Sequence, residues 1–410
     1  MHVGVVGAGL AGLATAHAFE HAGHTVEVFE STNRVGGRMN TIMVEGYPLD
    51  VGFHVLHTAY PTVQRWINIH QLQAKSMAKC SIFIQPSKGK TSTLGDGISS
   101  PKFILPSLKS VGVIDGIRFL SWRMKSKKHN LESNAMYDKK EIYEFLHDQK
   151  FSKNTKIKLK TLFSGITLDP SLSNHADFAQ FTWSAMAHGE MILPKNGIRA
   201  VPDQIHKKLQ HTQVHFNTSV VSLTPQSITT SQQTHNFDAV ILATPQHVTN
   251  RLLGRSPSPP LNNFRTKVFC FSSSNPPFRT PALMISEEWK ENCGEVLHVN
   301  VPTLLHAHPH GLNLVCATVI GNDVVTTTPE TIRSSLENWF GKSVEDWQFL
   351  TSTQVEYALP TKNESYRQGM QTDQSVYVVG DHCIHGSVQG TLESVERLLS
   401  ELQIPIPGVK

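Results

Sequence analysis

Three glycines near the N-terminus have the spacing of a phosphate-binding turn. They form the motif Gly7-x-Gly9-x-x-Gly12, which separates an apolar stretch from an alanine-rich one. Gly7 permits a tight turn, Gly9 lets the backbone approach a pyrophosphate, and Gly12 allows a helix to pack closely on a strand. The first amides of that helix would bind phosphate oxygens. We therefore expect a dinucleotide to contact Gly7, Gly9, Leu10, Ala11 and Gly12.

An acidic residue follows the glycine motif at the distance that a dinucleotide-binding unit requires. Glu30 lies 21 residues after Gly9 and ends a predicted strand over Thr25–Glu30. An acid at this place accepts hydrogen bonds from the adenosine ribose and disfavours a 2′-phosphate. Together with a strand over His2–Val6 and a helix over Leu10–His21, it predicts a β-α-β unit. A glycine-rich turn without a ligand would not require this acid.

A second glycine-rich segment follows Glu30 directly and narrows the choice of nucleotide. It reads Arg34-x-Gly36-Gly37-Arg38, and Asp50-x-Gly52 comes soon after it. With these motifs the sequence resembles the flavin-containing amine oxidase superfamily, in particular its phytoene desaturase-like and protoporphyrinogen oxidase-like branch. The resemblance implies that Gly36, Gly37 and Arg38 line the FAD pyrophosphate and flavin. Two glycine amides and a guanidinium suit a phosphate pair, and a plain surface turn is the alternative.

Motifs later in the chain resemble the same family. Leu193–Gly197 is similar to its Pro-x-Gly-Gly turn, with Asn196 in place of one glycine, and asparagine tolerates a left-handed backbone. The resemblance implies that the backbone of Val220 meets the adenine. It also implies that Asp381 accepts a hydrogen bond from the ribityl chain. The helix after Asp381, which contains Gly390, would direct its N-terminus at the flavin.

Candidates for catalysis are fewer than candidates for cofactor binding. Lys267 lies among apolar residues of a predicted strand. By the resemblance it aligns with a lysine that holds a water beside flavin N5, and an exposed lysine at a sheet edge is the alternative. His54 follows Asp50-x-Gly52 and is expected near the flavin, where neutral packing is the alternative to catalysis. Lys267 and His54 are therefore the two catalytic candidates.

Other kinds of site find little support in the sequence. His306, His308 and His310 alternate in a predicted loop, but a metal ion would need further ligands, so we predict no metal. Five scattered cysteines form no C-x-x-C pair and indicate a reducing compartment rather than a disulfide framework. For Cys383, a buried thiol is a commoner role than a covalent bond to flavin. We find no second dinucleotide motif and no nucleic-acid module.

Positive charge gathers in one stretch of the chain. Residues 101–160 contain fourteen Lys and Arg against six acids, a net charge of +8, whereas the whole chain carries +4. The basic and apolar stretch over 102–128 predicts peripheral contact with a membrane, and a solvated helical face is the alternative. No apolar run approaches the ~20 residues that cross a bilayer. We therefore expect a soluble, cytoplasmic protein without a presequence.

Strands suited to one α/β sheet come from the start, the middle and the end of the 410-residue chain. They are predicted over His2–Val6, Thr25–Glu30, Gln213–Phe216, Ala239–Ala243 and Val376–Gly380. We predict a Rossmann-like α/β FAD-binding domain over 1–60, 195–250 and 365–410. An interleaved α+β substrate domain would occupy 61–194 and 251–364, with a helix over Pro329–Phe340 in its second part.

The motifs and the resemblance together predict an FAD-dependent oxidoreductase. It would move hydride from a C–H bond of a small-molecule substrate to flavin N5. We favour a desaturase or dehydrogenase of an apolar substrate, and a flavin amine oxidase is the first alternative. A non-redox flavin isomerase and a protein that escorts lipid-modified GTPases on the same fold are further alternatives. The pattern selects no particular substrate, electron acceptor or oligomeric state.

Overall fold

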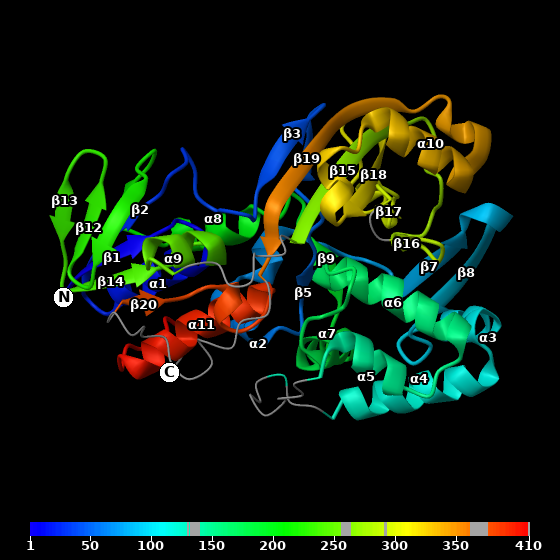
Figure 1. The fold of residues 1–410 in the computed structure, drawn as a ribbon, viewed down its shortest axis with the longest axis horizontal. Helices are drawn as coiled ribbons and strands as arrows, with labels where there is room; N and C mark the ends of the chain where they lie inside the picture. The colour runs from blue at the N-terminus through cyan, green and yellow to red at the C-terminus, as the bar shows by residue number, and fades with distance from the viewer. Residues whose placement is uncertain (129–130, 132–139, 256–263, 291–292, 361–375, 409–410) are drawn as a thin grey trace.

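Two large sheets, each assembled from separate stretches of the chain, form the molecule (Figure 1). The computed structural model describes residues 1–128, 131, 140–255, 264–290, 293–360 and 376–408. A parallel sheet with its helices lies on one side of Figure 1, and a mostly antiparallel sheet with a group of helices lies on the other. The chain passes between the two parts several times.

A five-stranded parallel sheet forms the first part. Its strands are β1 (His2–Val6), β2 (Thr25–Phe29), β10 (Gln213–His215), β14 (Ala239–Leu242) and β20 (Tyr377–Val378). Their order is β10-β2-β1-β14-β20, and every neighbouring pair is parallel. Val5 of the central strand pairs with both Val28 and Ile241, and all three side chains are fully buried. This agrees with a parallel sheet that is covered on both faces.

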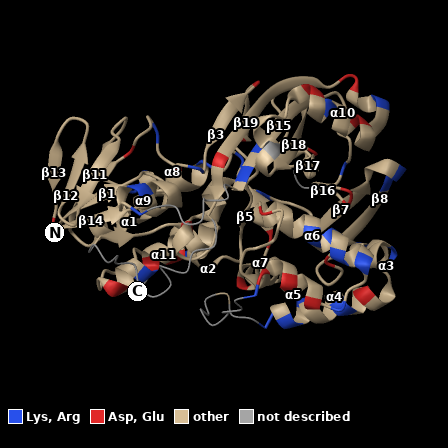
Figure 2. Cartoon of the chain, viewed as in Figure 1, with Lys and Arg blue, Asp and Glu red and all other residues tan. Residues whose placement is uncertain are grey.

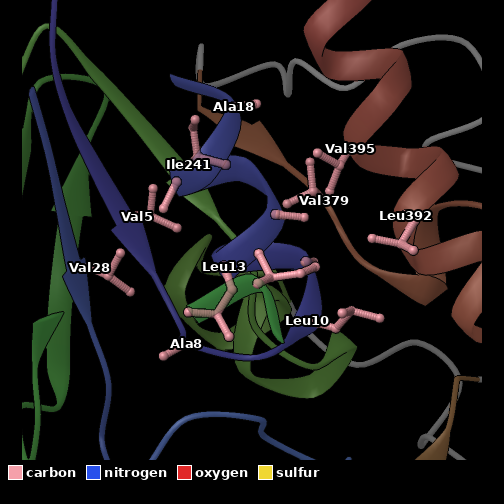
Figure 3. Packing of buried hydrophobic residues seen from close by; sticks show 14 of the residues in the cluster. Val5, Ala8, Leu10, Leu13, Ala18, Val28, Ile241, Val379, Leu392 and Val395 are labelled. Carbon is pink, nitrogen blue, oxygen red and sulfur yellow. The ribbon is translucent and has the colours of Figure 1, made fainter. Parts of the chain in front are cut away.

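Two helices from opposite ends of the chain cover one face of this sheet. Helix α1 (Leu10–His21) packs against β1 and β2, and α11 (Val388–Glu401) packs against α1. Figure 3 shows Leu13 of α1 near the sheet and Val395 of α11 beside Val379, within one continuous apolar core. A Cβ on Gly12 would overlap the Gly7 carbonyl oxygen, so the close approach of α1 requires glycine there.

A small antiparallel sheet covers the other face. It contains β11 (Val220–Thr224), β12 (Ser227–Thr230) and β13 (Thr234–Asn236). A Cβ on Gly4 of β1 would lie 2.6 Å from side-chain atoms of Ile228 and Phe237, which shows how closely the two sheets meet. Three short helices complete this part: α2 (Pro61–Trp66), α8 (Ala200–His206) and α9 (Gln246–Leu252).

A seven-stranded sheet forms the core of the second part. Its strands are β7 (Cys80–Gln85), β8 (Lys90–Gly95), β15 (Phe264–Ser273), β16 (Leu283–Ser286), β17 (His298–Asn300), β18 (Asn313–Ile320) and β19 (Gln348–Leu359). Their order is β19-β15-β18-β17-β16-β7-β8, and the β16–β7 pair is the parallel one. Helix α10 (Pro329–Phe340) covers one face with Ile332 and Leu336. The Thr328 hydroxyl caps this helix by accepting a hydrogen bond from the Thr331 amide.

Five helices extend the second part. They are α3 (Ile104–Val111), α4 (Val113–Ser126), α5 (Ile142–Asp148), α6 (Lys153–Thr167) and α7 (Ala176–His188). Their shared core contains Phe119, Leu159 and Phe163. In Figure 1, α3 and α4 lie at the edge of the molecule opposite the parallel sheet. In the part of the chain that the structure describes, every helix is too short or too polar to cross a bilayer.

Two smaller sheets lie between the large ones in Figure 1. The strands β3 (Thr41–Val44) and β4 (Tyr47–Asp50) form a hairpin that follows the second glycine segment. The strands β5 (Leu56–His57), β6 (Lys75–Ser76) and β9 (Met191–Leu193) form the other sheet. These elements connect the two parts where the cavity described below opens.

The predicted fold class, a Rossmann-like α/β part interleaved with an α+β part, is confirmed. Sequence reasoning missed the hairpin of β7 and β8, which lies in a stretch that reads as helical and irregular. Its strands are specified by pairing with β16 and by packing under α3, contacts that the local pattern does not contain. The predicted domain boundaries stay a prediction, and residues 365–375 of the last segment lie outside the described residues.

Candidate active site

Two glycine loops lie against each other at the N-terminus of α1. The Gly36 amide donates a hydrogen bond to the Ala8 carbonyl at 2.9 Å. A Cβ on Gly37 would lie 3.4 Å from the Cα of Gly9. Gly36 and Gly37 have φ angles of +104° and +56°, a region of backbone conformation that favours glycine. The structure thus brings the second predicted loop onto the first.

The first loop combines tight packing with one open position. Gly7 has a φ of +103°, and Gly7 and Gly12 pack too closely to accept side chains. A Cβ on Gly9, by contrast, would meet nothing within 4 Å in the described chain. No side chain caps α1 at Gly9, and the first amides of a helix have no partner within the helix itself. The loop therefore presents amide donors to open space.

Glu30 closes the same loop from the end of β2. Its carboxylate accepts hydrogen bonds from the Ala8 amide at 2.9 Å and from the Thr32 amide and hydroxyl at 2.9 and 2.8 Å. The Thr218 amide donates to the Glu30 carbonyl at 2.8 Å, and Val220 begins β11 two residues later. Glu30 and Val220, predicted for the ribose and the adenine, therefore lie close together.

A partly buried ion pair joins the second glycine loop to the C-terminal part of the chain. The Arg38 guanidinium lies 2.7 Å from a carboxylate oxygen of Asp381 and donates to the Ala358 carbonyl at 2.9 Å. Burial alone would raise the pKa of Asp381, but the Arg38 charge and its hydrogen bond hold this pKa far below its ordinary value. Asp381 is therefore ionised at neutral pH and holds Arg38 in place.

The N-terminus of α11 is capped by the turn that precedes it. The Ser387 hydroxyl accepts a hydrogen bond from the Gly390 amide at 3.0 Å. A Cβ on Gly390 would overlap the His385 carbonyl oxygen, so packing accounts for this glycine. The His385 ring in turn lies 5.2 and 4.6 Å from the rings of Phe178 and Phe181 on α7. Contact of Gly390 with a cofactor stays a prediction.

A cavity that opens to solvent lies between β4 and the seven-stranded sheet. Its lining includes Gly52, Phe53, His54, Asn300, His306 and Cys316. His54 Nε2 lies 2.9 Å from the Val51 carbonyl oxygen. This nitrogen must be the donor because a carbonyl oxygen only accepts, and in a neutral ring the other nitrogen, Nδ1, is then an acceptor. His54, a predicted catalytic residue, thus lies at a cavity.

Two polar residues of the cavity were not predicted. Asn300 comes from β17, and its side-chain oxygen has no hydrogen-bond partner among the described residues although the residue is only 7% exposed. His306 follows β17, and its Nε2 lies 2.9 Å from the Leu193 carbonyl oxygen. No sequence motif marks Asn300, which the pairing of β17 with β18 brings to the cavity, and His306 was noted only as one of three alternating histidines.

Asp50 holds the turn that resembles Pro-x-Gly-Gly. Its carboxylate accepts hydrogen bonds from the Ile198 amide at 2.8 Å and from the Thr41 hydroxyl at 2.7 Å, and burial raises the pKa of Asp50. Gly197 has a φ of +77°, and a Cβ there would overlap Thr41. The left-handed residue of this turn is therefore Gly197, whereas Asn196 does not adopt that backbone conformation.

Lys267 lies on the face of β15 that points away from the cavity. Its ammonium group donates to the Thr327 carbonyl at 2.9 Å and lies 4.9 Å from the ring centre of Phe269, which packs beneath α10. Val268, the next residue, lines the cavity. Neighbouring side chains of a strand point to opposite faces, so Lys267 and Val268 lie on opposite sides of β15, and the water-holding role of Lys267 stays a prediction.

The remaining candidates take part in packing. The described residues contain no group of three or more His, Cys, Asp and Glu side chains suited to a metal ion. Burial raises the pKa of the Cys383 thiol well above its ordinary value, and its sulfur lies 3.8 Å from the Val378 carbonyl oxygen. Cys270 and Cys316 are buried free thiols that face each other across β15 and β18, with sulfurs 3.6 Å apart.

Comparisons with known proteins agree with this geometry. The sequence profile of a family described as flavin containing amine oxidoreductase matches residues 10–279. A 4,4′-diapophytoene desaturase of Staphylococcus aureus is 46% identical over 52 residues, which cover 13% of this chain and 10% of the desaturase. The match therefore spans about a tenth of that enzyme's length.

Solved structures share the fold over almost the whole chain. An oxidoreductase from Methanosarcina mazei superposes with a TM-score of 0.72 at 18% identity, covering 98% of this chain and 100% of that one. Putrescine oxidase bound to putrescine superposes with a TM-score of 0.65 at 15% identity, covering 98% of each chain. At such identities the likeness concerns the fold.

Proposed function

The chain belongs to the flavin-containing amine oxidoreductase family, and from this premise we propose that it binds FAD and removes hydride from a C–H bond of an apolar substrate, as a desaturase or dehydrogenase. The family makes it a flavin-dependent oxidoreductase, while FAD and the substrate class are proposed. The observation that carries the proposal is the convergence of both glycine loops and the Arg38–Asp381 pair at the N-terminus of α1.

The residues at this place suit a dinucleotide. Amides in the first turn of α1 would bind the pyrophosphate, and the open position at Gly9 would admit it. The Glu30 carboxylate keeps further lone pairs for ribose hydroxyls. The backbone of Val220 would adjoin the adenine, and the Arg38–Asp381 pair would hold the flavin end. Both ends of an FAD molecule thus have candidate contacts.

The chain's own residues would position the substrate and move its proton. Bound FAD would supply the hydride acceptor at N5. His54 donates through Nε2 to Val51, which leaves Nδ1 of a neutral ring to accept a proton. Phe53 and Val268 give the cavity an apolar wall that would exclude water. This wall supports an apolar substrate, as does the short match to a desaturase.

The FAD site can be tested at Gly9, where a methyl group meets no protein atom. We expect Gly9→Ala to keep the fold and to weaken flavin retention at least about tenfold, because the new Cβ would occupy the pyrophosphate's approach. The measurement is the visible flavin band of the purified protein, with chromatography of the released cofactor. Gly165→Ala in α6 is the control, since a Cβ there would make ordinary contacts with Leu297 and His298. Equal flavin content in both variants would contradict the proposed site.

A second experiment distinguishes the proposed desaturase from the alternative functions. Carotenoid precursors, porphyrinogens and amines are added separately under anaerobic conditions. Only compounds of the true substrate class should bleach the flavin band. We expect bleaching by an apolar C–H donor. Bleaching by amines alone would instead identify an amine oxidase. Turnover without lasting bleaching would identify an isomerase, and a colourless protein that cannot be reconstituted with FAD would favour the GTPase-escort alternative.

We also propose that the enzyme meets its apolar substrate at a membrane, through peripheral contact of residues 102–128. The basic and apolar composition of this stretch supports the contact, and so does the exposure of its helices α3 and α4 at the edge of the molecule (Figure 2).

A further inference from the structure

Large apolar side chains are exposed at high density on α3 and α4. Sixteen such side chains are exposed among the described residues, and seven of them fall between positions 104 and 124. They are Ile104, Leu105, Val113, Ile114, Ile117, Leu120 and Met124, with exposed fractions between 46% and 68%. Soluble proteins rarely expose such a patch unless it binds a partner.

Helix α4 has two apolar faces where packing into the core needs one. Phe119 and Trp122 point inward and pack in the core of the helical group. Val113, Ile117, Leu120 and Met124 recur at intervals of three and four residues, so they form one stripe on the opposite face. The burial of α4 therefore accounts for its inner face only.

The exposed charges of residues 97–128 are all positive. Residues 97–128 contain one acid, Asp115, which is buried and pairs with Arg118 at 2.8 Å. Lysines 102, 109, 125, 127 and 128 are exposed around the stripe. Figure 2 shows α3 and α4 at the outer edge of the molecule. An apolar stripe with a rim of lysines is the pattern of a helix that lies in an anionic lipid interface.

We propose that α4 docks on an anionic membrane surface, with Val113, Ile117, Leu120 and Met124 in the acyl boundary and the surrounding lysines at the headgroups. This rests on the proposed membrane contact of 102–128 and names its face and its lipid, and it does not depend on flavin chemistry. A second copy of the chain is a poorer occupant. A two-fold contact through this face would bring like charges together.

Vesicle co-sedimentation tests the proposal with the whole protein. We expect binding to phosphatidylcholine vesicles that contain phosphatidylglycerol, weaker binding to pure phosphatidylcholine, and a decrease with added salt. Ile117→Ser combined with Leu120→Ser should reduce the affinity about tenfold or more. Lys125→Glu should reduce it at least about fivefold, as expected for one lost cation near the surface.

Control variants carry the same changes elsewhere on the exposed surface. Val221→Ser on β11 and Lys342→Glu after α10 should leave vesicle binding unchanged. Flavin content and circular dichroism should match the wild type in every variant, which separates this surface from the flavin site. Absence of binding to anionic vesicles would overturn the proposal, and so would unchanged binding by the Ile117/Leu120 variant. A wild-type dimer that this variant converts to a monomer would assign the face to a second copy instead.

Discussion

Arg38 and Asp381 are 343 positions apart in the chain, yet their side chains meet at 2.7 Å. Arg38 follows the second glycine loop, and Asp381 follows the last strand of the parallel sheet. The Asp381 carboxylate is buried, and a buried carboxylate is costly without a cation beside it. This ion pair links the N-terminal and C-terminal segments of the chain at the candidate site.

Removing the cation should therefore damage both the site and the fold. We expect Arg38→Met to raise the pKa of Asp381, since burial then acts without the opposing charge, and to lose most of the bound flavin. Destabilisation on the order of 3–5 kcal/mol should accompany this loss. Flavin absorbance per protein and urea unfolding measure the two effects.

The matched control removes a cation from an exposed pair. Lys140→Met breaks the contact of Lys140 with Asp148, in which both side chains are more than half exposed. It should change neither flavin content nor the unfolding midpoint, because solvent screens such pairs. If Arg38→Met kept its flavin as fully as Lys140→Met, the role of Arg38 at the cofactor would be refuted.

At the scale of elements, a second buried pair fixes helix α6 to the seven-stranded sheet. Lys158 of α6 lies 2.7 Å from Glu287, which follows β16, and both side chains are at most 5% exposed. Gln85 at the end of β7 donates to the other oxygen of Glu287 at 2.9 Å. Three elements distant in sequence thus share one carboxylate, so the pair aligns the helical group with the sheet.

We expect Lys158→Met to destabilise the protein by about 3–5 kcal/mol, because Glu287 would remain buried without its cation. The double variant Lys158→Met/Glu287→Leu should recover most of this loss, since no uncompensated charge remains. Urea unfolding of the wild type, both single variants and the double variant gives the coupling. A double variant as unstable as Lys158→Met would show that the pair does more than neutralise itself.

At the scale of the whole molecule, three histidines are held in protein interiors that disfavour their charge. Burial lowers the pKa of His57, His298 and His385 from 6.5 to about 4. His298 packs its ring 5.0 Å from Phe53 beside the cavity, and His385 packs against α7. They belong to both parts of the molecule, so their protonation would act on the whole fold.

The protein should therefore lose stability as the pH falls from 6.5 towards 4. In this interval the unfolded chain binds protons that the folded chain excludes, so stability rises with pH. Over the full interval, each such histidine lowers the free energy of unfolding by on the order of 3 kcal/mol as the pH falls. Asp381 does not contribute to this change in stability. Its pKa is lowered in the folded protein, so its stabilising charge is lost only at pH values below this interval.

Thermal unfolding across this pH interval checks the expectation. The unfolding temperature of the wild type should fall steadily between pH 6.5 and pH 4. His298→Gln should show a shallower slope, because one proton-linked site is gone. A wild-type unfolding temperature that stays level over this interval would contradict the assignment of buried neutral histidines.

The sequence by itself determined the nucleotide-binding elements of this protein. The helix Leu10–His21, the strand His2–Val6 and the placement of Glu30 follow from spacing over some thirty residues, and the structure has the same elements. Local spacing is enough there because turn, helix and strand are neighbours in the chain. The resemblance also marks Arg38 and Asp381 as cofactor contacts, whereas their pairing is known only from the structure.

Only the tertiary structure decided which side chains share the cavity and which face of each element meets solvent. Lys267 points towards the Thr327 carbonyl rather than into the cavity, because the register and pairing of β15 select its face. Asn300 reaches the cavity through the order of strands, and no local pattern carries that order. Likewise, the sequence of the stripe on α4 looks the same as that of a helix face buried in a core. It is exposed because Phe119 on the opposite side of the helix already fills the core.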